Sequence, residues 1–124
     1  MKFMLMMHTP RAGWKDAGIG TWPPDDIKAH INFMHRFNKE LTEAGEFVDA
    51  QGLALPEEAR VVRARKGGGA PEVTDGPFAE AKELVGGFFL IDVPTREEAL
   101  EVARQCPAAE WATIEVRETG PCFT

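Results

Sequence analysis

The residues Leu84-Val85-Gly86-Gly87-Phe88-Phe89-Leu90-Ile91-Asp92-Val93 form the most hydrophobic stretch of the chain. An apolar run of this length and composition indicates a strand in the middle of a sheet. Immediately before it stand Thr74-Asp75-Gly76-Pro77-Phe78-Ala79-Glu80-Ala81-Lys82-Glu83. Gly76 allows backbone angles that other residues avoid, and Pro77 fixes its own φ and disfavours helix at Gly76. We therefore predict that Asp75 sits on a stiff corner beside a sheet edge.

Two interpretations of Asp75 are open from the residues alone. Binding and catalytic groups tend to lie on rigid loops of a packed scaffold, which makes Asp75 a candidate catalytic acid or base. Phe78, in the same corner, is then a candidate substrate-binding residue. Turns also commonly use an Asp carboxylate to cap their own backbone, and that would give Asp75 a structural role only.

The hydrophobic pattern on either side of this stretch predicts further strands. Consecutive apolar positions near the N-terminus and alternating ones near the C-terminus indicate two of them, and a run of glycines indicates a hairpin turn. The expected strands are residues 2–8, 46–53, 84–93 and 111–118, with a hairpin at 60–66 and 72–74 around Gly67-Gly68-Gly69.

Two helices are expected between the strands. Apolar residues recur at helical spacing over residues 27–41, with Asp25 or Asp26 as the N-cap and Gly45 as the stop. Thr95-Arg96-Glu97-Glu98 is a capping box that opens the second helix, which ends at Pro107.

The order of these elements predicts the fold. Strand, helix, strand, hairpin, strand, helix, strand is the pattern of an α+β, ferredoxin-like split βαβ domain with an inserted β-hairpin, here one domain over residues 1–124. Two helices cover only one face of such a sheet, yet residues 1–7 and 84–93 are apolar on both alternations. A bare apolar face of that size is not tolerated in a monomer, so we expect a homodimer with closed twofold symmetry.

Composition excludes several classes of function. The formal charge of −6 argues against nucleic-acid binding, and the basic residues Arg60, Arg63, Arg65 and Lys66 fit a solvated edge strand better than a phosphate-binding face. No stretch approaches the ~20 apolar residues of a membrane span. The two cysteines do not have the spacing of a zinc site. We expect a cytoplasmic protein, because the short apolar stretch at residues 3–7 is not a secretion signal and free cysteines suit a reducing compartment.

The first predicted helix carries three candidate site residues. At ~100° per residue, His30 falls inside the apolar arc, while His35 falls on its flank. His30 is therefore either a catalytic group facing a pocket or a core histidine bonded to one backbone carbonyl. Asn38 lies next to the apolar arc in a helix interior, where Asn is a poor helix former. It either orients a ligand or Asp75, or bonds a nearby loop.

Cofactor and metal sites are not expected. His30 and His35 are five residues apart, about 140° around the helix, and do not chelate as an i, i+4 pair does. The chain has no G-x-G-x-x-G or P-loop pattern. The loop over residues 9–22 is long for a compact domain, and loops of this kind are lids, binding segments or mobile connections. Trp14 in this loop either closes over a ligand, which makes it a candidate substrate-binding residue, or docks on the domain's own surface.

The central stretch also resembles a known family. Asp75-Gly76-Pro77-Phe78 followed by Ala79-Glu80-Ala81-Lys82-Glu83 and by Gly86-Gly87-Phe88-Phe89-Leu90-Ile91-Asp92-Val93 looks like the signature of the DGPF branch of YCII-related proteins. Supporting matches are Met1-Lys2-Phe3-Met4-Leu5, Phe37-Asn38-Lys39-Glu40-Leu41 with Ala44-Gly45, and Cys106-Pro107. The resemblance implies a dimeric α–β barrel, in which two ferredoxin-like units pack sheet to sheet, and it includes Asn38.

The resemblance also implies chemistry. Related proteins carry a histidine–aspartate pair suited to general acid–base work, in which the carboxylate orients the imidazole ring. Counting back from Gly45 places their histidine at Met34, whereas the Ala29-His30 pair after the proline-led helix start matches it to His30. A dyad with Asp75 would then depend on His30, which lies one turn away from the counted position.

Two hypotheses of function follow. In the first, the protein is a cofactor-independent acid–base enzyme of lyase or isomerase type on a small metabolite, with Asp75 and His30 catalytic and Asn38, His35, Phe78 and Trp14 in substrate binding. In the second, it is a non-catalytic ligand-binding or regulatory partner, because DGPF-type proteins are similar to partners of extracytoplasmic-function sigma factors. Its acidic surface would then meet a basic partner.

Overall fold

A computed structural model describes residues 1–11, 19–77 and 81–120. Four strands form an antiparallel sheet in the order β2-β5-β1-β6, and two form a separate hairpin sheet. The strands are β1 (Lys2–Pro10), β2 (Phe47–Gly52), β3 (Arg60–Arg63), β4 (Glu72–Asp75), β5 (Glu83–Asp92) and β6 (Thr113–Glu118). With helices α2 (Pro24–Glu43) and α3 (Arg96–Gln105), this is the expected α+β, ferredoxin-like order with an inserted hairpin.

The long helix α2 begins two or three residues earlier than expected and without a side-chain cap. Pro23 is the N-cap residue, and Asp25 and Asp26 lie inside the first turn, so the expectation that one of them caps the helix was wrong. Their charges still face the positive end of the helix dipole there. Gly45, with φ of +72°, follows the helix in the left-handed region, which glycine adopts without steric cost.

The short helix α3 begins as the capping box predicts. The hydroxyl of Thr95 accepts a hydrogen bond from the backbone N–H of Glu98 at 3.2 Å. The inward positions Ala99, Ala103 and Cys106 are buried, and the helix ends before Pro107.

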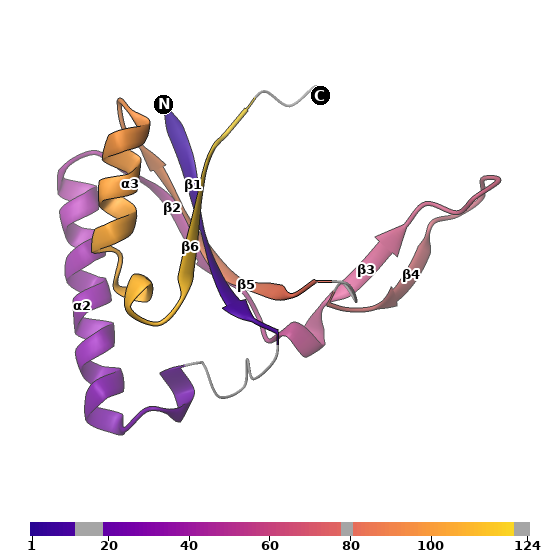
Figure 1. Ribbon diagram of the computed structural model, residues 1–124, viewed down its shortest axis with the longest axis horizontal. Coiled ribbons are helices and arrows are strands. Elements are labelled where there is room, and N and C mark those ends of the chain that lie inside the picture. The colour runs from indigo at the N-terminus through magenta and orange to yellow at the C-terminus, as the bar shows by residue number, and fades with distance from the viewer. Residues whose placement is uncertain (12–18, 78–80, 121–124) are drawn as a thin grey trace.

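Both helices cover the same face of the sheet, which is seen edge-on in Figure 1. Alternate residues of the two central strands point to this face, and they are the most deeply buried of the protein. Phe3 and Leu5 on β1 and Ile91 on β5 have no exposed area, and Phe89 meets Phe37 of α2 edge to face at 5.5 Å between ring centroids. We call this the closed face.

The intervening residues of β1 and β5 point to the other side of the sheet. Met4 pairs with Leu90 and Met6 with Phe88, and all four are half-buried and lie outside the core cluster. No described element packs over them as the helices do on the closed face. We call this the open face.

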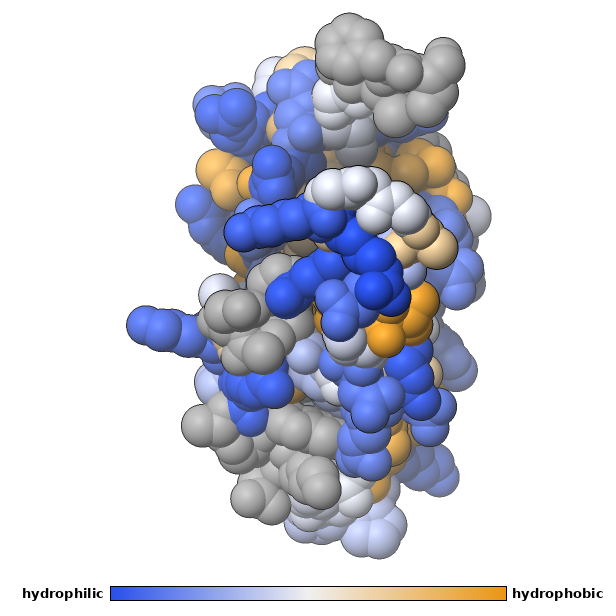
Figure 2. All heavy atoms as spheres, turned by 90° about the vertical axis from the view of Figure 1, so that its right-hand side faces the viewer, coloured by the Kyte–Doolittle hydropathy of each residue, from blue (hydrophilic) through white to orange (hydrophobic). Residues whose placement is uncertain are grey.

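The β3–β4 hairpin projects away from the sheet on the side opposite the helices (Figure 1). Gly67, Gly68 and Gly69 all have positive φ at its tip, as the glycine run predicts. Val62 and Val73 are paired across the hairpin and are each 63% exposed. Seen from the hairpin side, hydrophobic patches appear between hydrophilic side chains (Figure 2).

Candidate functional site

The corner before β5 holds its shape through contacts with the hairpin base. Asp75 is the last residue of β4, and the Gly76–Pro77 peptide bond that follows is cis. The Gly76 N–H donates a hydrogen bond to the carbonyl of Ala59 at 2.9 Å. A Cβ at position 76 would lie 2.9 Å from the Cβ of Ala59, so the close approach requires glycine here.

The hairpin register places a guanidinium beside Asp75. Arg60 and Asp75 are cross-strand partners, and Arg60 Nε lies 3.5 Å from Asp75 Oδ1. Arg60 Nη1 also donates hydrogen bonds to the carbonyls of Ala59 at 2.8 Å and Glu57 at 3.2 Å. Two backbone anchors therefore hold the guanidinium in place.

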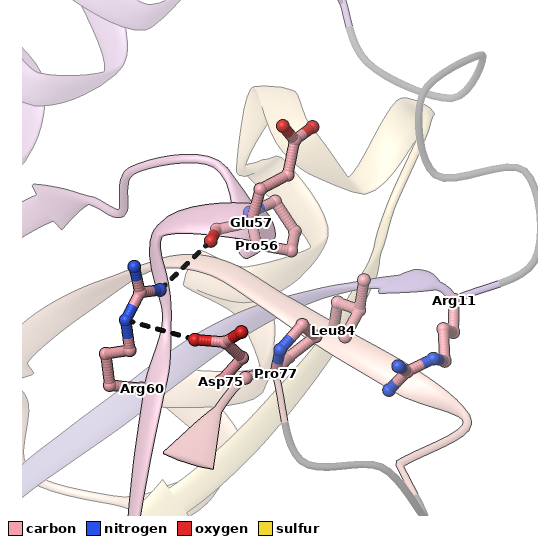
Figure 3. A pocket seen from close by; sticks show the side chains of 8 residues that line it. Arg11, Pro56, Glu57, Arg60, Asp75, Pro77 and Leu84 are labelled. Carbon is pink, nitrogen blue, oxygen red and sulfur yellow. Dashed lines mark hydrogen bonds and ion pairs between the residues drawn. The ribbon is translucent and has the colours of Figure 1, made fainter. Parts of the chain in front are cut away.

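These residues line a cavity of about 440 Å³, drawn in Figure 3. Arg11, which follows β1, contributes a second guanidinium from the opposite side, while the carboxylate of Glu57 points away from Asp75 (Figure 3). The Asp75 side chain is 93% exposed in the single chain and is reachable from solvent. The cavity has the size of a small-molecule site and brings one carboxylate together with two guanidinium groups.

An apolar recess of about 180 Å³ adjoins this cavity. Pro56 and Leu84 line both, so the two share a wall. Leu53, Leu55 and Val85 extend the recess with partly exposed apolar side chains. A molecule with one charged and one apolar end matches this arrangement of linings.

The geometry separates the two interpretations of Asp75. In the described residues, its carboxylate pairs with Arg60 and caps no backbone group of its own turn. Asp75 thus faces a cavity. Its catalytic role stays a prediction.

His30 lies in a different cavity, of about 490 Å³, at the start of α2. The two cavities share no lining residue, so a single chain does not bring His30 and Asp75 together. His30 is 5% exposed, and its ring meets Trp22 and Trp111 edge to face at 5.4 and 6.0 Å between centroids. Among the described residues it has no hydrogen bond, so the backbone carbonyl considered for a core histidine is not found.

Asn38 and His35 line neither cavity. Asn38 is half-buried, and its Oδ1 is buried without a hydrogen-bond partner in the described part of the chain, so it holds neither Asp75 nor a loop. His35 is exposed on the flank of α2, as the helical wheel predicts. Trp14 and Phe78 lie outside the described residues. Roles of these four residues in substrate binding stay predictions.

A histidine–carboxylate pair does occur, though not the expected one. His8 Nε2, at the end of β1, lies 3.0 Å from Glu115 Oε1 on β6, and His8 Nδ1 is buried without a partner in the described ranges. Glu115 alternates with Ile114 and Val116, which pack on the core, so the pair belongs to the open face.

Arg60 and Arg11 are the site residues that the sequence interpretation missed. The hairpin around Gly67-Gly68-Gly69 carried a signal for Arg60, because pairing the strands about that turn sets residue 60 opposite residue 75. Arg11 had no such signal, since it reaches the cavity through the long-range pairing of β1 with β5. Within residues 1–11, 19–77 and 81–120, no group of three His, Cys, Asp or Glu side chains is placed to hold a metal ion.

Comparisons with known proteins identify the family of the chain. The profile of the YCII-related domain matches residues 1–121. A protein of Rhizobium meliloti (strain 1021), itself described as uncharacterised, is 32% identical over 92 residues, which cover 74% of this chain and 73% of the relative. The chain belongs to the YCII-related family. Membership of the DGPF branch stays a prediction from the motif at residues 75–78.

Proposed function

We propose that the protein is a cofactor-independent acid–base enzyme, of lyase or isomerase type, on a small metabolite that carries an anionic group. The observation behind the proposal is that Asp75, Arg60 and Arg11 line one cavity of about 440 Å³. Asp75 transfers the proton, because its carboxylate faces this space and is reachable from solvent. His30 lines another cavity and is not needed for the step.

The two arginines position the substrate. A guanidinium group binds carboxylates and phosphates through paired N–H donors, and it stabilises the negative charge that develops when a C–H proton is removed. Arg60 is held by the carbonyls of Glu57 and Ala59 and keeps its position when Asp75 gains or loses a proton. The apolar recess beside Leu84 accommodates the uncharged part of the metabolite.

The test is exchange of substrate protons for deuterium. A panel of small carbonyl-containing carboxylic acids is incubated with the protein in D₂O, and loss of C–H signals is followed by NMR. For any acid that exchanges, Asp75→Asn is expected to slow exchange by about 10²- to 10⁴-fold, the usual contribution of a general base. Glu57→Gln is the matched control, because its carboxylate points away from Asp75 (Figure 3). Unchanged exchange in Asp75→Asn would remove Asp75 from the mechanism.

We also propose that the working form is a homodimer that covers the open face. Met4, Met6, Phe88 and Leu90 form an apolar row there, and the protruding hairpin adds Val62 and Val73. A second copy is the partner that buries such a face by symmetry. Light scattering after size exclusion is expected to give twice the chain mass, and Leu90→Glu is expected to halve it. A monodisperse single chain at micromolar concentration contradicts the dimer.

A cytoplasmic location is the remaining part of this proposal. It is supported by the free, buried thiol of Cys106, which fits a reducing compartment. Neither α2 nor any other helix within the described ranges combines the length and apolarity that a membrane span needs.

The projecting hairpin favours a second candidate function, that of a regulatory partner of an extracytoplasmic-function sigma factor. The β3–β4 hairpin stands clear of the rest of the domain (Figure 1), and its Val62–Val73 pair is exposed to a partner protein. Co-purification of a sigma factor that is lost in Val62→Asp supports this function, whereas self-association alone counts against it.

A further inference from the structure

The cavity beside His30 has the features of a binding site in its own right. It lies where η1 (Ile19–Thr21), the first turns of α2 and η3 (Pro107–Glu110) meet, away from the Asp75 cavity. Trp22, Asp26, His30, Phe33 and Glu110 line it. Its volume of about 490 Å³ is in the range of small-molecule sites.

His30 is the first feature that suits a ligand. The side chain is 5% exposed, and it has no hydrogen bond to any residue in the described ranges. Its ring nitrogens are not among the fully buried, unpaired polar atoms of the described residues, so they remain open to a ligand in the cavity that His30 lines. The rings of Trp22 and Trp111 contact the His30 ring edge to face, and neither contact provides a hydrogen bond to a His30 nitrogen.

The charge of the lining is the second such feature. Asp26 and Glu110 both line the cavity, and neither has an ion pair with a described residue. No lysine or arginine of the described chain is part of the lining. The faces of Trp22 and Phe33 also attract cations, and the guanidinium of Arg36 already lies 5.6 Å from the Phe33 ring centroid.

We propose that this cavity binds a small primary amine with an apolar body. The ammonium group donates hydrogen bonds to the carboxylates of Asp26 and Glu110 and to the ring nitrogen of His30. The apolar body packs against Trp22. A primary ammonium is favoured over a quaternary one because only an N–H donor satisfies His30. The site is independent of the proton transfer assigned to Asp75.

The experiment is a calorimetric titration of the full chain with 2-phenylethylamine, checked by quenching of tryptophan fluorescence. Two analogues are titrated for comparison. The neutral 2-phenylethanol lacks the positive charge, and the N,N,N-trimethyl derivative of the amine keeps the charge but has no N–H donor. The primary amine is expected to bind about tenfold or more tightly than either, since charge-assisted hydrogen bonds supply the difference. Raising the ionic strength weakens the binding, because the two carboxylates are exposed.

Variants locate the site. Asp26→Asn and Glu110→Gln are each expected to weaken binding of 2-phenylethylamine about three- to tenfold, the range for charged groups open to solvent. Asp25→Asn is the matched control, because Asp25 lies in the same first turn of α2 but does not line the cavity. His30→Phe keeps a buried ring and is expected to remove the preference for the primary over the trimethylated amine.

Three results overturn the proposal. These are equal binding of 2-phenylethanol, equal losses in Asp25→Asn and Asp26→Asn, and no titration heat with any of the three compounds. Each variant is first shown to be folded by circular dichroism. Asp75→Asn leaves amine binding unchanged, so a failure of the proposed enzyme function is recognised separately.

Discussion

The two faces of the β2-β5-β1-β6 sheet are built by the same strands and have different surroundings. On the closed face, Leu5 and Ile91 are wholly buried beneath α2 and α3. On the open face, Met6 and Leu90 are half-buried, with the His8–Glu115 pair near them. The difference shows that strand alternation divides side chains between faces, while burial depends on what packs above each face.

The comparison also separates stability from function. The closed face holds the hydrophobic core, including Phe37, Phe89 and Val93. The Asp75 cavity forms at the far end of β5 from that core, where the strand meets the hairpin base. Substitutions on the closed face are therefore expected to affect folding first, and those on the open face to affect association first.

The largest difference is expected between two neighbouring residues of β5. Ile91→Ala removes a side chain with no exposed area and is expected to lower the free energy of unfolding by about 2–5 kcal/mol. Leu90→Ala is expected to cost less than half as much in the isolated chain, because Leu90 is only half-buried. Urea denaturation at several protein concentrations measures both. Equal losses at low concentration contradict the contrast between the faces.

Two adjacent glycines of β5, Gly86 and Gly87, differ in how closely other atoms pack around them. A Cβ at Gly87 would lie 2.8 Å from the backbone oxygen of Gln51, so Gly87→Ala forces a backbone shift and is expected to cost about 1–3 kcal/mol. A Cβ at Gly86 meets nothing within 4 Å, and Gly86→Ala is expected to be neutral or to stabilise by up to about 1 kcal/mol. Thermal unfolding measures the stability of both variants. If Gly86→Ala lost more stability than Gly87→Ala, the close contact at Gly87 would not limit the packing of β5.

The N-cap of α3, a helix on the closed face, contributes a smaller amount to the free energy of unfolding. Thr95→Ala removes the hydroxyl that accepts from Glu98 N–H and is expected to cost about 1 kcal/mol. Thr95→Ser keeps the hydroxyl and is expected to retain most of the stability. If both variants lose the same amount in denaturant titrations, the threonine methyl group, and not the cap, stabilises the helix start.

The smallest effect concerns Cys106, which is buried beneath the closed face. Burial raises the pKa of the Cys106 thiol, against the opposing effect of the Ala108 and Ala109 backbone. The stability that the buried, protonated thiol contributes is therefore fully present below the unfolded pKa of about 9.0. This contribution is lost as the pH rises above 9.0 and through the higher pKa of the folded state. The unfolding free energy of the native chain minus that of Cys106→Ala is expected to fall above pH 9, by at most about 1.4 kcal/mol per pH unit. A difference that is flat up to pH 10.5 contradicts the burial effect.

The candidate site could be predicted from sequence in part. The Asp75 corner follows from Gly76 and Pro77, which act through local backbone angles. The depth of His30 follows from its place on the apolar arc of α2. Whether these two residues share one cavity could not be predicted from the sequence, because it depends on where α2 and β4 lie relative to the sheet. Arg11 was missed for the same reason.

The sequence by itself determined the elements and their order, because helix spacing, strand alternation, the Thr95 cap and the glycine turns act over a few residues. Only the tertiary structure decided which side chains share a cavity. Strand pairing joins Thr9 to Leu84 and Arg60 to Asp75, and helix packing sets His30 against Trp111. These contacts join residues far apart in the chain, and their geometry is set by the packing of the whole sheet and not by any local pattern.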